Sequence, residues 1–79
     1  MIDAAQIRAA RALLNMSQSE LAAAASVSPA SVKRLEAASA IRGAAETLWK
    51  VETSLEKLGV EFIPAEGGKG PGVRLRQAR

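Results

Sequence analysis

The sequence contains no cysteine, no histidine and no tyrosine. Without cysteine and histidine, the chain has no disulfide, no thiolate nucleophile, no Ser-His pair and no ligand set for a zinc site. Carboxylates, lysine amines and hydroxyls are the groups that remain for chemistry. We therefore expect a protein that is not an enzyme and that needs no metal or cofactor.

Long hydrophobic runs are missing as well. The longest covers residues 21 to 25, whereas a transmembrane helix needs about 20 apolar residues. Residues 1 to 6 have no basic segment ahead of an apolar run, as a secretion signal would. We therefore expect a cytoplasmic protein that makes no membrane contact.

The 79 residues are enough for one small domain. A chain of this size buries only about 60 to 65% of its unfolded surface, so a second subunit or very regular helices would help to stabilise it. The formal charge of +3 is modest, but it divides into +2 for residues 1–43, −2 for residues 44–63 and +3 for residues 64–79. A basic balance fits a polyanionic partner without proving one.

The first 25 residues predict two helices. Ile7, Ala10 and Leu14 recur at helical spacing and place one face of a first helix over residues 4–14. Asn15 follows, and asparagine often takes the left-handed conformation that ends a helix. Residues 17–20, Ser-Gln-Ser-Glu, have the form of a capping box, which predicts that a second helix begins there and runs to about residue 25.

A third helix is predicted over residues 29–37. Ser28 is a typical N-cap, and Pro29 stands at the first helical position, where proline is well tolerated. This helix would bury Val32 and Leu35 and turn its polar residues outward. Ala22 in the second helix is small enough to allow close crossing of the two helices.

The remainder predicts one more helix and two strands. After a polar linker over residues 38–43, a leucine and valine stripe predicts a fourth helix over residues 44–58. Gly59 would end it. Residues 60–63 and 73–76 have the composition and alternation of strands, separated by a glycine-rich stretch that predicts a mobile loop. The predicted fold is mainly α, with residues 1–58 forming four helices and residues 59–79 a C-terminal two-stranded β-ribbon.

Residues 16–22, Met-Ser-Gln-Ser-Glu-Leu-Ala, and residues 27–36, Val-Ser-Pro-Ala-Ser-Val-Lys-Arg-Leu-Glu, resemble the helix-turn-helix of the Xre, or lambda-repressor-like, family of bacterial and phage regulators. The resemblance covers about residues 6–37, and the C-terminal strands resemble those of very short Xre-type regulators. It implies a helix-turn-helix domain that binds double-stranded DNA with helix 29–37 in the major groove. It also implies a nucleoid-associated transcriptional regulator, with repression favoured over activation.

The resemblance assigns DNA contacts to residues at the start of the second helix, on the outer side of the third and before the fourth: Ser17, Gln18, Ser28, Ala30, Ser31, Lys33, Arg34 and Arg42. Arg34 is expected to bind guanine, because a guanidinium can bond to O6 and N7 together. Lys33, Gln18 and Arg42 are expected to contact the phosphate backbone. Arg34 and Lys33 forming an ordinary solvated face is the alternative.

Two features depart from the family pattern. Ser26 stands where the family usually has glycine, so the turn would be strained by about 1 kcal/mol if Ser26 adopts a positive φ. Pro29 and Ala30 replace polar side chains at the tip of helix 29–37, so specificity would rest more on Arg34 and on DNA shape. Arg11 and Glu36 match an ion pair of the family, with a DNA contact by Arg11 as the alternative.

We expect a homodimer, because two recognition helices related by two-fold symmetry bury twice the surface, on half-sites about 34 Å apart. The ribbon is the expected dimer element. One isolated hairpin could not stabilise the apolar face that its strands share, which is formed by Val60, Phe62, Val73 and Leu75. Whether Trp49 of the fourth helix joins the interface stays open.

A competing interpretation makes the chain a protein-interaction module. An antitoxin-like or accessory subunit would use its ribbon and its basic residues Arg74, Arg76 and Arg79 to bind an acidic regulatory protein partner, with DNA binding secondary. The same arginines could instead contact phosphates, or simply keep an exposed strand edge soluble. Retardation of DNA at low salt separates the two interpretations.

Overall fold

A computed structural model of the chain describes residues 2–37 and 45–78. It contains α1 (Ala4–Leu14), α2 (Gln18–Ala25), α3 (Pro29–Ala37), α4 (Ala45–Lys57), β1 (Val60–Ile63) and β2 (Gly72–Leu75). The mainly α fold with a C-terminal two-stranded sheet is therefore confirmed. The expected linker over residues 38–43, with Arg42, lies outside the described residues. Within those residues no helix is both long and apolar enough to span a membrane.

Both N-terminal helices begin with a capping box. The Ser17 hydroxyl accepts a hydrogen bond from the Glu20 amide at 3.0 Å, and the Glu20 carboxylate accepts one from the Ser17 amide at 2.8 Å. Asp3 and Gln6 make the same reciprocal pair at 2.8 and 2.9 Å. The box of Ser17 and Glu20 was predicted from the sequence. The box of Asp3 and Gln6 has the same three-residue spacing, with aspartate in place of serine and glutamine in place of glutamate.

The residues that end α1 and α2 both adopt the left-handed backbone conformation. Asn15 has φ 55°, as predicted, and Ser26 has φ 57°. Ser26 therefore carries the backbone strain expected of a residue other than glycine in this conformation, about 1 kcal/mol. The Val27 amide donates to the Ala22 carbonyl at 3.0 Å, which closes the end of α2 and directs the chain into α3.

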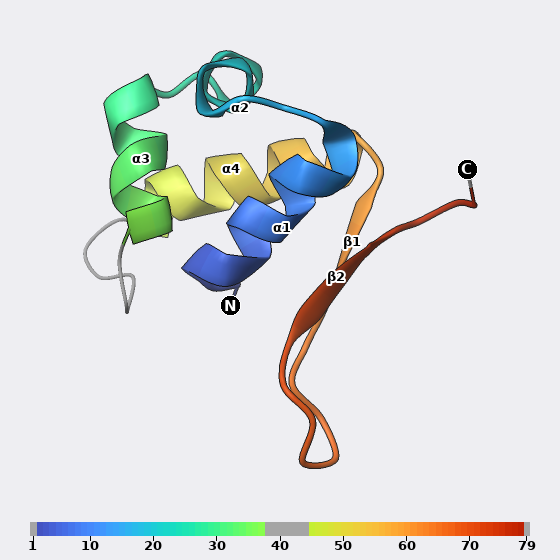
Figure 1. The fold of residues 1–79 in the computed structure, drawn as a ribbon. Coiled ribbons are helices and arrows are strands. Elements are labelled where there is room, and N and C mark those ends of the chain that lie inside the picture. The colour runs from blue at the N-terminus through green and yellow to red at the C-terminus, as the bar shows by residue number, and fades with distance from the viewer. Residues whose placement is uncertain (1, 38–44, 79) are drawn as a thin grey trace.

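The core lies where all four helices meet. Ile7, Leu21, Val32, Val51 and Leu55 are fully buried, and they come from α1, α2, α3 and α4. Buried alanines in α1 and α2 leave no bulky side chain between the helices, which allows them to approach closely. Figure 1 shows α2 and α3 on one side of α1 and α4, and the ribbon leaving on the other side.

The two strands form an antiparallel ribbon in which Val60 faces Leu75 and Phe62 faces Val73. β2 begins at Gly72, one residue earlier than predicted. Beyond the strands, residues 64–71 form an exposed extension, which we call the arm (Figure 1). Its tip is a tight turn rather than an irregular loop, because Glu66 and Lys69 exchange two backbone hydrogen bonds of 3.0 Å around two glycines. Both glycines have positive φ, 59° and 78°, as a two-residue hairpin turn requires.

The apolar face of the ribbon is turned toward the helices of the same chain. Val60 is fully buried, and Phe62 and Val73 are half-buried against the core. The Gln6 side-chain amide secures the base of the ribbon by donating to the Gly72 carbonyl at 2.9 Å and to the Ile63 carbonyl at 3.3 Å. Residues 59–78 therefore share one core with the helices, and the expectation of Val60 as an interface residue needs correction, because it has no exposed surface.

Candidate nucleic-acid interface

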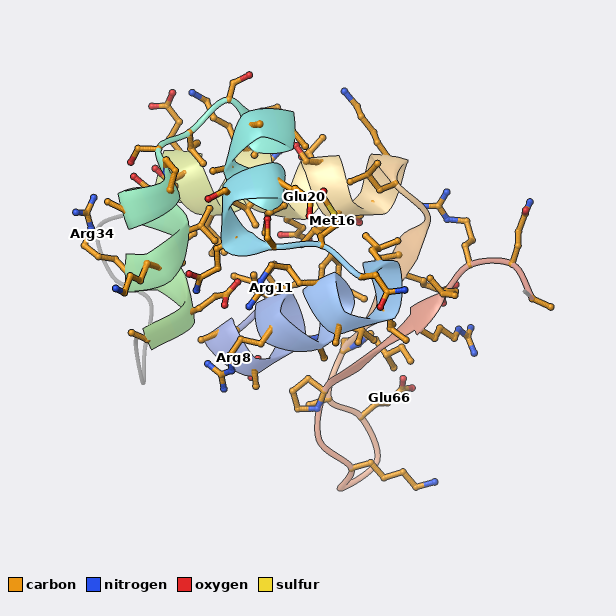
Figure 2. All side chains as sticks on the ribbon, turned by 45° about the horizontal axis from the view of Figure 1, so that its top comes forward. Arg8, Arg11, Met16, Glu20, Arg34 and Glu66 are labelled. Atoms are coloured by element: carbon orange, nitrogen blue, oxygen red, sulfur yellow. The ribbon has the colours of Figure 1, made fainter. Side chains whose placement is uncertain are left out.

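The two faces of α3 differ sharply in polarity. Val32 and Leu35 are buried against the other helices, with 0% and 4% of their surfaces exposed. Ala30, Lys33 and Arg34 are exposed on the opposite side, and Figure 2 shows Arg34 pointing away from the body of the protein. The apolar anchors thus hold α3 from beneath and leave its outer side free for a ligand.

Hydrogen bonds connect the polar residues of this outer side. The Ser28 hydroxyl accepts from the Ser31 amide at 3.1 Å and caps α3, and it lies 2.9 Å from the Ser31 hydroxyl. Arg34 Nη2 lies 3.4 Å from the same Ser31 hydroxyl. Two hydroxyls and a guanidinium therefore follow one another at three-residue spacing. This row presents donors and acceptors of the kind that bind base edges and phosphates.

The outer side of α3 carries positive charge without a competing acid. Lys33 and Arg34 are exposed, whereas Glu36, the single acidic residue of α3, has only 4% of its surface exposed. Its charge is directed inward, where Arg11 neutralises it. The exposed charges of α3 are therefore all positive, which suits a surface that binds a polyanion.

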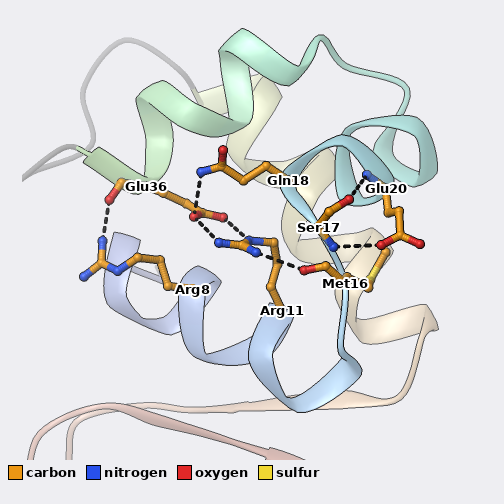
Figure 3. Close-up of polar contacts among 7 residues, drawn as sticks. All are labelled: Arg8, Arg11, Met16, Ser17, Gln18, Glu20 and Glu36. Atoms are coloured by element: carbon orange, nitrogen blue, oxygen red, sulfur yellow. Dashed lines mark hydrogen bonds and ion pairs between the residues drawn. The ribbon is translucent and has the colours of Figure 1, made fainter.

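The ion pair between Arg11 and Glu36 joins α1 to the end of α3 (Figure 3). Arg11 Nε lies 2.6 Å from Glu36 Oε2, and Nη2 lies 2.8 Å from Oε1. The remaining nitrogen, Nη1, donates to the Met16 carbonyl at 2.9 Å. All three nitrogens of Arg11 are thus engaged inside the chain, which favours the ion pair over the alternative of a DNA contact.

Gln18 completes this junction from α2. Its side-chain amide donates to Glu36 Oε1 at 3.1 Å, and the residue is half-buried (Figure 3). Gln18 therefore positions the start of α2 against the end of α3. Ser17 beside it is exposed, although its hydroxyl is used for the cap.

Glu36 is charged at neutral pH in spite of its burial. Burial alone raises the pKa of a carboxyl group. Hydrogen bonds from Arg11 and Gln18, together with the charges of Arg11 and Arg8, outweigh that effect and hold the pKa of Glu36 below its ordinary value. The hydrogen bond to Glu36 in turn raises the pKa of Arg11. The junction is therefore a charged pair within the protein rather than a neutral one.

Arg8 is a member of this junction that the sequence interpretation missed. Its guanidinium Nη1 donates to the Glu36 backbone carbonyl in the last turn of α3. A cation is favourable there, because helix C-termini carry partial negative charge. The available signal was the spacing of Arg8 and Arg11, which puts both side chains on the same side of α1.

The structure describes seven of the eight expected DNA-contacting residues. They lie at the N-terminus of α2, in the cap of α3 and on the outer side of α3: Ser17, Gln18, Ser28, Ala30, Ser31, Lys33 and Arg34. Arg42 lies outside the described residues. Within the described part of the chain, no cluster of three or more histidine, cysteine, aspartate or glutamate side chains offers a metal site.

The arginines of the ribbon are occupied within the chain. Arg74 forms an ion pair with Glu61 at 2.8 Å. Arg76 donates to the Glu56 carbonyl at the end of α4 and, at 3.4 Å, to the Val60 carbonyl. The contact of Arg76 with Glu56 anchors the ribbon to α4, and the engagement of both arginines leaves α3 as the main candidate for binding a polyanion. Arg79 lies outside the described residues.

Comparison with known proteins agrees with this geometry. The sequence matches the helix-turn-helix family HTH_3 over residues 7–57. The matched segment is more than half of the chain, and it reaches from α1 to the end of α4. No curated protein matches the sequence.

Proposed function

Because the chain belongs to this helix-turn-helix family of DNA-binding regulators, we propose that it binds a specific operator with α3 in the major groove and represses transcription. The observation that carries the proposal is the outer side of α3. There, Ser28, Ser31 and Arg34 form a row of polar side chains while Val32 and Leu35 anchor the helix from below. Such a protein works in the cytoplasm, at the nucleoid.

Arg34 is the proposed base-reading residue. Within residues 2–37 and 45–78, its exposed guanidinium is held only by a bond of 3.4 Å to Ser31, so it can turn toward guanine at little cost. A bidentate contact to guanine O6 and N7 distinguishes guanine from the other bases by about 1 to 3 kcal/mol. Ala30 would contact a thymine methyl group, and Ser28 and Ser31 would bond to bases or phosphates.

The phosphate contacts are proposed for Lys33, Ser17, Gln18 and Arg42. Backbone amides at a helix N-terminus attract anions, and Ser17 and Gln18 stand at the beginning of α2. Gln18 uses one amide hydrogen on Glu36, which leaves the other for a phosphate oxygen. A phosphate contact here would therefore act on a residue that also positions α3.

A homodimer is part of the proposal. Two copies related by a two-fold axis would place two α3 helices on half-sites about 34 Å apart. The ribbon is proposed to form part of the dimer interface. Val60 is fully buried in the core, whereas Phe62, Val73 and Leu75 keep part of their surface exposed.

A gel-shift titration with DNA from the upstream region of its own gene tests the proposal. Arg34→Ala should reduce the preference for the operator by about 1 to 3 kcal/mol, because a base contact is lost. Lys33→Ala is the matched control, and it should weaken binding to all sequences equally. It should also reduce the slope of log affinity against log salt concentration by the amount that corresponds to about one phosphate contact. Unchanged affinity and footprint with Arg34→Ala would refute the assignment of Arg34, and no retardation of any DNA at low salt would refute DNA binding.

The competing function, an interaction module for an acidic regulatory protein, draws less support from the geometry. Its binding surface was to be the basic ribbon, yet Arg74 and Arg76 are engaged with Glu61 and with backbone carbonyls of the same chain. A pull-down with the wild-type chain and an Arg74→Ala, Arg76→Ala double variant would reveal such a partner. We therefore favour the operator-binding function.

A further inference from the structure

Trp49 is a large apolar residue that lies mostly exposed on α4. This tryptophan, the only one in the sequence, has 64% of its surface exposed on α4. Leu58 is the only other large hydrophobic residue with an exposed side chain among the described residues. The Trp49 indole makes no hydrogen bond within the described residues. Tryptophan is enriched among the residues that dominate the energy of protein interfaces.

A hollow of matching character lies beside α4. It is bounded by α4, by the start of α1 and by the base of the arm, with an apolar wall formed by Phe62, Pro64, Ala65 and Pro71. Two residues with carboxylates, Asp3 and Glu52, also line it. Glu52 is half-buried and forms no hydrogen bond or ion pair within the described residues. The hollow thus offers an apolar wall and an unused acceptor.

The aromatic side chain and the hollow belong to the same side of the molecule. Glu52 follows Trp49 by three residues on α4, so the two side chains are neighbours on the helix surface. A surface that carries a projection and a hollow side by side can pair with a copy of itself about a two-fold axis, because each projection then meets the hollow of the other copy.

We propose that two copies of the chain dimerise by reciprocal insertion of Trp49. Each indole enters the hollow of the other copy, packs on its prolines and Phe62, and donates its N–H to the partner's Glu52. A second copy fits this surface better than an unrelated protein does, because the unpaired donor and the unpaired acceptor both occur on the same chain. This inference rests on the proposed function in one respect, namely that a two-fold operator needs a dimer.

The area that such a dimer buries is adequate when the arm takes part. A buried tryptophan covers about 150 to 250 Å², so two supply about 300 to 500 Å², whereas a stable interface buries about 1,200 Å² or more. Every residue of the arm is exposed, and the base of the arm forms the wall of the hollow. An inserted α4 would therefore lie against the arm of the other copy, which adds the missing area.

The proposed interface leaves the DNA-binding side free. Figure 2 shows Arg34 projecting from α3 on one side of the molecule and the arm, with Glu66, extending away from α3. Dimerisation through α4 and the arm covers none of Ser28, Ser31 and Arg34. The DNA-binding surface and the proposed dimer surface are therefore separate, so DNA binding and dimerisation can be tested separately.

The single tryptophan makes the test direct. Trp49 emission should shift to the blue as the wild-type concentration is raised through the dimer dissociation constant, and sedimentation should show monomer and dimer over the same range. Trp49→Ala should weaken dimerisation by about 30-fold or more, the effect of losing an interface hot spot. Leu58→Ala is the matched control, because Leu58 is the other exposed large hydrophobic residue among the described residues but lines a different hollow, beside Leu75 and Arg76, and its removal should leave the dimer intact.

A second variant keeps the test independent of the folding of the first. Ala65→Arg places a bulky charge in the exposed wall of the hollow while keeping Trp49, and it should be monomeric with an unchanged circular dichroism spectrum. Adding the Trp49→Ala chain, which has no tryptophan but an open hollow, should then shift the emission of the Ala65→Arg chain to the blue. One of the two reciprocal contacts is restored in this mixture.

Three results would overturn the proposal: wild-type emission that does not change with concentration, a dimer equally tight in Trp49→Ala, or no shift in the mixture. Gel shifts with the same proteins keep the two proposals apart. A monomeric Trp49→Ala variant should still bind one half-site with the same base preference. A wild-type chain that dimerises but retards no DNA would refute the proposed function alone.

Discussion

Two pairs of arginine and glutamate in this protein have nearly the same shortest distance and very different surroundings. Arg11 and Glu36 approach to 2.6 Å, and Arg74 and Glu61 to 2.8 Å. In the first pair, 21% of the arginine side chain and 3% of the glutamate side chain are exposed, against 64% and 41% in the second. Distance alone therefore does not measure what a pair contributes, because water screens the second pair and is largely kept from the carboxylate of the first.

The pairs also differ in what they join. Glu36 receives hydrogen bonds from Arg11 of α1 and Gln18 of α2, so three helices meet at one carboxylate. Glu61 and Arg74 stand opposite each other on strands that the backbone already holds together. The first pair thus fixes the orientation of the recognition helix, whereas the second adds to a contact that exists without it.

Glu36→Ala should have the largest effect on this comparison. It leaves the Arg11 charge within the protein with only the Met16 carbonyl as a partner, and breaking a buried pair in this way costs about 3 to 5 kcal/mol. Urea unfolding followed by circular dichroism measures the loss. The double variant Arg11→Met, Glu36→Met should regain much of the stability, because no unpaired charge remains. If Glu36→Ala lowers the unfolding free energy by less than about 1 kcal/mol, the pair of Arg11 and Glu36 contributes no more than an exposed pair does.

Acid should remove part of the same stabilisation. The pKa of Glu36 is lower in the folded chain than its ordinary value of 4.5, so its contribution is complete above that value and is lost as the pH falls through the lower, folded pKa. The pKa of Glu20 is lowered too, by hydrogen bonds from Ser17. The measurement is therefore the difference in unfolding free energy between wild type and Glu36→Gln, which should shrink below pH 4.5. A difference that is constant between neutral and acid pH would contradict a charged Glu36.

Local signals allowed much of the fold to be predicted. The bounds of α3 and β1 agree with the sequence prediction, because a serine cap with a following proline and a glycine helix end act within a few residues. The burial of Val32 and Leu35 follows from helical spacing in the same way. The turn of the arm was also available from its Gly-Gly pair, although the sequence interpretation took the segment for a mobile loop.

The features that escaped prediction depend on contacts between distant residues. Gln6 binds the carbonyls of Ile63 and Gly72, which are 57 and 66 residues away, and no spacing rule connects them. The same holds for the ribbon. Its apolar alternation was predicted correctly, but the packing of its apolar face against helices of the same chain was not predicted. Alternation shows that Val60 and Phe62 share a face, but only the packing against α1 and α4 shows that this face is covered by the same chain. Of the candidate DNA contacts, the exposure of Lys33 and Arg34 followed from helical spacing, whereas the hold of Gln18 on Glu36 did not.

The smallest expected effect belongs to the exposed pair. Glu61→Gln keeps the size of the side chain and removes its charge, and it should change stability by less than about 1 kcal/mol, because exposed pairs contribute about 0 to 1 kcal/mol. The effect should shrink further at high salt, where exposed charges are screened over about 3 Å at 1 M. Urea unfolding at low and high salt measures both. Arg74→Gln is the matched control and should behave alike. If Glu61→Gln lowers the unfolding free energy as much as Glu36→Ala does, water does not weaken the pair of Arg74 and Glu61. Burial would then not explain the difference between the two ion pairs.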